Sequence, residues 1–80
     1  MSDEGRTVEL DVRPLLEENK EPFKDIMEAV NSLGPNDVFI LHATFKPIPL
    51  FKVLERKGFQ HEDTHEGESH WIIRFWKEQS

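Results

Sequence analysis

The histidines are the residues of this sequence whose type and spacing could do chemistry. His61 and His65 alternate with Asp63 along a polar stretch, and His70 follows after a short segment that contains glycine. A two-residue turn at Gly67-Glu68 would set His65 directly across from His70 on paired strands. Two or three imidazoles with a carboxylate can bind a divalent metal ion. Polar alternation on an exposed edge strand explains the same pattern without an ion, and we predict a function with no metal and no cofactor.

His42 is the second candidate, because it ends a strongly apolar stretch and precedes a sequence rich in proline. Loops and helix N-termini gather ligands where strands leave an α/β sheet. His42 together with Lys46 could therefore form a small-ligand site. The alternative is that His42 ends the strand and hydrogen-bonds the neighbouring loop, and that Lys46 is simply solvated.

Other catalytic groups do not form a complete constellation. The chain contains no cysteine, which excludes disulfides and thiolate nucleophiles. Its many carboxylates fall in expected loops or on an expected edge strand, where they ionise normally. The serines lack a nucleophile elbow, and no glycine-rich loop could cradle a phosphate. We therefore expect a protein without enzymatic activity.

The charge balance narrows the class of partner. Sixteen acidic and ten basic side chains give a formal charge of −6 over 80 residues. Such a chain repels nucleic-acid backbones and anionic membrane surfaces. No apolar run approaches the roughly 20 residues of a membrane span, and the N-terminal residues do not resemble a signal peptide. We expect a cytoplasmic protein that binds neither nucleic acid nor membrane.

The elements that must position these residues follow from hydrophobic periodicity. Alternation every two residues indicates strands, and apolar spacings of three and four residues indicate helices. The predicted elements are a strand at 7–12, a loop at 13–21, a helix at 22–33, a strand at 37–43, a helix at 47–57 and a hairpin with strands at 59–66 and 71–76.

This order predicts an α+β fold, a two-layer α/β sandwich of β-α-β-α-β-β topology. Right-handed strand–helix–strand connections place both helices on one face of a mixed four-stranded sheet with strand order 1-2-4-3. A single domain is expected over residues 7–77, between a flexible N-terminus at 1–6 and a C-terminal tail at 78–80. The other face of the sheet is left bare.

The two central strands carry apolar residues on both faces of the sheet. One layer of helices can cover the apolar residues of only one of these faces. In the last strand Ile72, Arg74 and Trp76 alternate with side chains of the opposite face. Apolar patches that contain Trp and Arg often mark partner surfaces. The alternative is a shallow cluster covered by long side chains and the chain termini. The interaction surface that we predict consists of Phe39, Leu41, Ile72, Arg74 and Trp76.

Three features together resemble a known family. They are Leu10-Asp11-Val12-Arg13 at the end of the first strand, Pro-x-Pro-Leu at 47–50, and the Trp-rich last strand. From about Val8 to Lys77 the chain resembles the uncharacterised bacterial domain of unknown function 2249 family, a relative of the TusA/SirA-like sulfur-carrier proteins. The resemblance implies the same two-layer fold.

The resemblance also implies partners, but not the sulfur-carrier activity. Sulfur carriers place a persulfide-bearing cysteine before the first helix, where this chain has Asn19-Lys20-Glu21-Pro22 and no thiol. In the family that the chain resembles, an acidic residue usually follows the histidine that corresponds to His42, and this chain has Ala43 there. Members of the family often accompany hemerythrin-like or redox proteins. We therefore expect a noncatalytic interaction or accessory module, a monomer or weak homodimer, with a ligand-binding or metal-binding accessory protein of redox or sulfur metabolism as the alternative.

Overall fold

The structure, a computed structural model, describes residues 5–77 of the chain. The terminal residues for which the sequence predicts a flexible N-terminus and a tail lie mostly outside this range. The elements are β1 (Thr7–Asp11), α1 (Arg13–Glu17), α2 (Phe23–Asn31), β2 (Val38–Ala43), α3 (Ile48–Arg56), β3 (Phe59–Gly67) and β4 (His70–Lys77).

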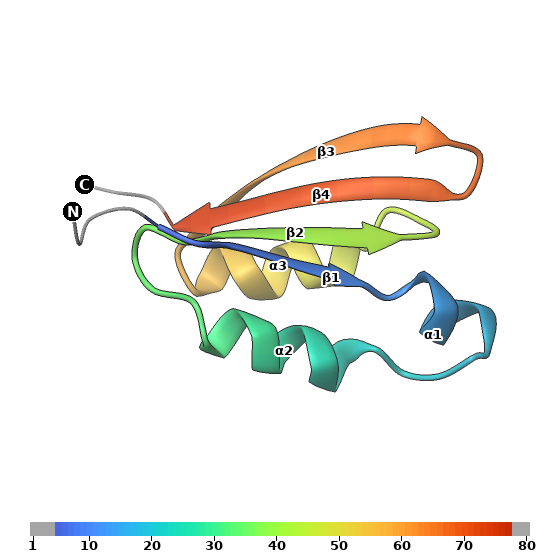
Figure 1. The fold of residues 1–80 in the computed structure, drawn as a ribbon, viewed down its shortest axis with the longest axis horizontal. Helices are drawn as coiled ribbons and strands as arrows, with labels where there is room; N and C mark the ends of the chain where they lie inside the picture. The colour runs from blue at the N-terminus through green and yellow to red at the C-terminus, as the bar shows by residue number, and fades with distance from the viewer. Residues whose placement is uncertain (1–4, 78–80) are drawn as a thin grey trace.

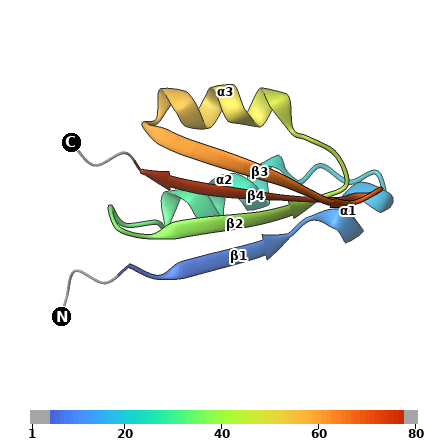
Figure 2. The ribbon, with the colours of Figure 1, turned by 90° about the horizontal axis from the view of Figure 1, so that it is seen from above.

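The four strands form one mixed sheet with the order β1-β2-β4-β3, as the sequence predicts. β1 and β2 are parallel, whereas β4 is antiparallel to both β2 and β3. Figure 1 shows α2 and α3 on the same side of the sheet, and Figure 2 shows β1 and β3 as its two edges. The predicted α+β fold with one covered and one open sheet face is confirmed.

The hydrophobic core lies between the helices and the sheet. Its centre consists of side chains from the two interior strands that are completely inaccessible to solvent: Phe39, Leu41, Ile73 and Phe75. From the helices, Ile26 and Val30 of α2 and Leu50, Phe51 and Leu54 of α3 close this layer. Burial of apolar area at roughly 25 cal/mol per Å² is the main stabilising contribution available to a chain without disulfides.

The segment that follows β1 differs from its prediction. Residues 13–17 form the short helix α1 rather than a loop, because Pro14 suits a first helical turn and Leu15 and Leu16 pack against the core. Phe23, an apolar residue of the helix predicted at 22–33, is 46% exposed. α2 begins at Phe23 with Pro22 as its N-cap residue, so this ring stands at the entrance of the helix, outside the core.

Asp37 joins the start of the sheet to its neighbours. Its carboxylate accepts hydrogen bonds from the backbone N–H groups of Arg6 (2.7 Å) and Gly34 (2.8 Å), and from the Arg6 guanidinium. These bonds lower the pKa of Asp37 to about 2, the Arg6 backbone bond most of all. The Asp37 carboxylate, almost completely buried, therefore stays charged and fixes the chain before β1 against β2. Across residues 5–77, none of the helices has the length and apolar character needed to span a membrane.

Candidate functional site

The open face of the sheet combines an apolar centre with polar edges. Residues paired across strands share a face, so Val38 with Trp76, Ile40 with Arg74, and His42 with Ile72 all lie on the side away from the helices. Among them only Arg74 is exposed, and the others are half-buried. The edge strands contribute exposed polar side chains to this face, namely Thr7, Glu9 and Asp11 from β1 and Gln60, Glu62 and Thr64 from β3.

Two interactions orient Arg74 on this face. Its guanidinium lies over the Trp76 ring at 5.0 Å and donates a hydrogen bond of 3.0 Å to Glu62. A guanidinium above an indole shields the apolar ring from water on one side while it remains charged. The Trp76 ring is therefore held in a defined position beside an exposed cation.

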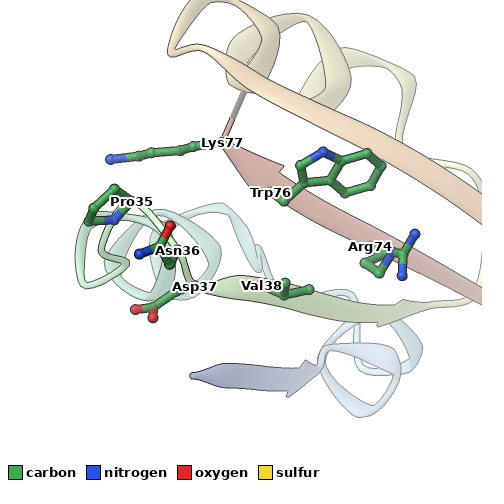
Figure 3. A pocket seen from close by; sticks show the side chains of 7 residues that line it. All are labelled: Pro35, Asn36, Asp37, Val38, Arg74, Trp76 and Lys77. Atoms are coloured by element: carbon green, nitrogen blue, oxygen red, sulfur yellow. The ribbon is translucent and has the colours of Figure 1, made fainter. Parts of the chain in front are cut away.

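A hollow of about 330 Å³ opens beside this pair. Figure 3 looks into it, with Val38 on β2 and Arg74 and Trp76 on β4. The loop before β2 and Lys77 complete the wall. An indole, an aliphatic side chain and cations at the rim suit an apolar side chain of a partner better than a small polar substrate.

Two residues of the predicted interaction surface lie on the other face. Phe39 and Leu41 have no exposed area, because they point into the helical layer and pair with Phe75 and Ile73. The continuous apolar run of β2 does not by itself say which alternate residues meet the helices. The open face uses Val38 and Ile40 instead. The predicted positions of Ile72, Arg74 and Trp76 on that face agree with the structure.

The structure brings His42, His70 and Glu9 together at one end of the open face. His42 Nδ1 lies 2.9 Å from His70 Nε2, and His42 Nε2 lies 2.5 Å from a carboxylate oxygen of Glu9. The two imidazole rings are 5.1 Å apart and tilted by 30°. The sequence prediction did not include Glu9. Its position opposite Ile40 on β1, two residues before the partner of His42, was the signal that could have found it.

The hydrogen bonds define the tautomers of the two imidazoles. An ionised carboxylate only accepts, so the His42 Nε2–H donates to Glu9. In the neutral ring His42 Nδ1 is then the acceptor, and His70 Nε2–H donates to it. The three groups form a continuous chain across β1, β2 and β4 in which both nitrogens of His42 have partners.

The predicted cluster of His61, His65 and His70 does not form. His61 stacks on Phe51 at 4.1 Å and His65 on Trp71 at 4.1 Å, both on the helix-covered side of β3. His70 lies on the opposite face, because it pairs with Gly67 and an irregularity between His65 and Gly67 shifts the register. The turn lies at residues 68–69, one position later than predicted. In the described range of 5–77, no three ligating side chains are grouped to hold a metal ion.

Lys46 and His42 do not share a site either. Lys46 Nζ lies 3.5 Å from a carboxylate oxygen of Asp63 on β3, whereas His42 points onto the open face. The loop after β2 carries the lysine toward the outer edge of the sheet. The structure therefore does not bring together the two residues of this predicted ligand site.

A second hollow lies at the opposite end of β2 from the first one, where α1 and α2 meet the loop after β2. It has a volume of about 690 Å³, and Phe23, Phe45, Pro47 and Pro49 contribute to its wall. The segment 19–22 forms part of its rim. Sequence analysis did not predict this groove, because it depends on how two loops meet.

Carboxylates lie along both edges of the open face, where Asp11 pairs with Arg13 and Glu62 with Arg74. The Arg13 side chain hydrogen-bonds to Asp11, and this interaction lowers the pKa of Asp11 to about 2. Asp11 and Glu9 stand on β1 and Glu62 on β3, so carboxylates border the apolar centre on both sides.

Comparison with known proteins places this geometry in a family context. A family model described as "Uncharacterized conserved protein (DUF2249)" matches residues 9–77. This range includes both interior strands and all three residues of the hydrogen-bonded chain, Glu9, His42 and His70. No curated protein and no solved structure matches the chain.

Proposed function

Because the chain belongs to the uncharacterised DUF2249 family, with residues 9–77 matched, we propose a function from its geometry: it is a noncatalytic module that binds another protein through the open face of its sheet. The observation that carries the proposal is the strip of Val38, Ile40, Ile72 and Trp76 along the middle of this face. A sheet face that meets only water normally carries polar side chains.

The features of the strip suit a protein partner. Trp and Arg are the residue types most enriched among side chains that dominate binding energy, and here they are adjacent and mutually oriented at 5.0 Å. The hollow beside them, about 330 Å³, can take an apolar side chain. Burying the half-exposed strip against a partner would then remove the remaining apolar area from water.

The charge of the rim favours a partner that is basic around an apolar centre. Glu9, Asp11 and Glu62 border the strip, and the whole chain carries a formal charge of −6. Two copies of a chain with this net charge would repel one another in a dimer. A different protein is therefore the favoured occupant, and self-association is weak by comparison.

The first partners to test are hemerythrin-like and redox proteins, because the family resemblance implies these classes. We expect the interaction to take place in the cytoplasm, as the composition suggests. The test is affinity capture from the cells of origin with three forms of the chain. The forms are the wild type, an open-face variant with Ile40→Thr and Ile72→Thr, and a control with Lys24→Ser and Lys52→Ser on the exposed sides of α2 and α3. Threonine keeps the strand preference while it removes apolar area.

We expect the wild type and the helix control to retain the same partner and the open-face variant to lose it. Circular dichroism and urea unfolding check that all three forms are folded. Equal retention by the open-face variant would contradict the proposal, as would loss of the partner only in the helix control. Sedimentation of the purified wild type measures self-association, and a tight dimer that buries the strip would replace the proposed partner with a second copy.

A further inference from the structure

We infer that His42 and His70 form a binding site for one first-row divalent transition-metal ion such as Zn²⁺ or Ni²⁺, with Glu9 as the carboxylate that orients His42. The site adjoins the apolar strip of the proposed function, because His42 pairs with Ile72, but none of its three residues belongs to that strip. It rests on the chain of contacts from Glu9 through His42 to His70, in which 2.5 Å and 2.9 Å separate the successive polar atoms.

His42 already has the form that a metal ligand requires. A ligating histidine usually donates its second N–H to a carboxylate, which fixes the tautomer and raises the basicity of the ligating nitrogen. Glu9 accepts that hydrogen bond from His42 Nε2, so His42 Nδ1 carries a free electron pair directed at His70. The His42 side chain is only 15% exposed, so its rotamer is confined by its neighbours.

The spacing of the two nitrogens fits a shared ion. Two nitrogens bound to one ion at about 2.1 Å, with an angle between 90° and 109°, lie about 3.0–3.4 Å apart. The observed separation of His42 Nδ1 and His70 Nε2 is 2.9 Å, so the rings need to part by only a few tenths of an ångström. They must also turn outward, because the present hydrogen bond aims each nitrogen at the other.

When both imidazoles are neutral, the ion binds without net loss of a proton. His70 moves its proton from Nε2 to Nδ1 by exchange with water, and this frees Nε2 as the second ligand. Imidazole nitrogens favour Zn²⁺, Ni²⁺ and Cu²⁺ over Mg²⁺ and Ca²⁺. With two protein ligands on an open sheet face, water would fill the remaining coordination positions.

The remaining histidines provide matched controls. His61 and His65 stack on Phe51 and Trp71 on the opposite side of the sheet, so neither can reach the proposed ion. Each can be changed to alanine without touching Glu9, His42 or His70. A surface on which any histidine binds metal would respond equally to all four substitutions.

The experiment is calorimetric titration of the full chain with ZnCl₂ and NiCl₂ at neutral pH, using the wild type and the variants His42→Ala, His70→Ala, Glu9→Gln, His61→Ala and His65→Ala. We expect one equivalent to bind the wild type. His42→Ala and His70→Ala should each lower the affinity at least about tenfold, and Glu9→Gln about tenfold, in the range found for carboxylates that support ligating histidines. His61→Ala and His65→Ala should stay close to the wild type.

A second measurement on the unmodified chain removes any dependence on how the variants fold. Imidazole ¹⁵N spectra recorded during the Zn²⁺ titration should show His42 Nδ1 and His70 Nε2 changing together and saturating at one equivalent. Adventitious metal binding only would appear as non-saturating shifts spread over all four histidines. That result, or an equal loss of affinity in His61→Ala or His65→Ala, would overturn the inference.

Discussion

Ile72 and Ile73 are neighbours in β4, yet Ile73 has no exposed area and Ile72 is half-buried on the opposite face. Ile73 pairs with Leu41 beneath the helices, and Ile72 pairs with His42 on the open side. The two isoleucines differ because helices cover one face of the sheet and leave the other open. The proposed binding surface depends on this difference between the faces.

The same pair gives a direct test of which face is covered. Ile73→Val removes one methyl group from the packed layer and should cost about 0.5–1.5 kcal/mol of unfolding free energy. Ile72→Val removes the same group from a face that water reaches, and it should cost clearly less. Urea unfolding monitored by tryptophan fluorescence measures both. An equal or reversed pair of losses would contradict the assignment of faces.

Gly58 ends α3 in a conformation that other residues avoid. Its φ angle is 92°, and no atom lies within 4 Å of the position that a Cβ would take. Gly58→Ala should therefore destabilise the fold by about 1 kcal/mol through backbone strain alone, without a steric clash. Gly67→Ala is the matched control, since it also meets open space but has no positive φ. A neutral Gly58→Ala would contradict the left-handed helix end.

The carboxylate of Asp37 should make stability depend on acid pH. Hydrogen bonds from the Arg6 and Gly34 backbone lower its folded-state pKa from 3.8 to about 2. The unfolded chain thus binds a proton more readily, so the stabilisation is complete above pH 4 and is lost as pH falls toward 2. Asp37→Asn should lower stability at neutral pH and flatten the fall between pH 4 and pH 2.

Urea unfolding of both proteins across this pH range provides the measurement. Glu28→Gln, an exposed substitution on α2, serves as the control and should leave the pH profile of the wild type unchanged. If Asp37→Asn kept the full acid dependence of the wild type, another carboxyl group would be responsible.

Association with the proposed partner should depend on salt. Carboxylates of Glu9, Asp11 and Glu62 border the open face. The Debye length, over which salt screens charges, falls from about 10 Å at 0.1 M salt to about 3 Å at 1 M. Once a partner is isolated, its association rate should fall with added salt while dissociation changes less, because rim charges steer encounter. Surface plasmon resonance at increasing salt measures both rates. An association rate that rises with salt would contradict an acidic rim that attracts a basic partner.

Periodicity was sufficient for the four strands and the two longer helices, because each of these elements carries a clear apolar pattern, whereas α1 has no such pattern and was missed. The alternation of Val8 and Leu10 and the four-residue run of β2 predict an edge strand and an interior strand, as found. The same run was ambiguous about which face Phe39 and Leu41 occupy, since both faces of an interior strand are apolar. Only the packing of the helices decides between them.

The candidate site was harder to predict because it depends on register. His42 and His70 are 28 positions apart, and they meet only because β4 lies between β2 and β3. The irregularity between His65 and Gly67 shifts the register by one residue, so His65 pairs with Trp71 and lies on the face opposite His70. The hydrogen-bonding role of Glu9 follows from the parallel pairing of β1 with β2, which spacing along the chain does not reveal.

Site-specific photo-crosslinking in the cells of origin would show whether the open face of the sheet contacts a partner. A photoreactive amino acid replaces Arg74 on the open face in one form and Lys52 on the exposed side of α3 in another. We expect a discrete crosslinked protein from position 74 and none from position 52. The same adduct from position 52, with none from position 74, would contradict it.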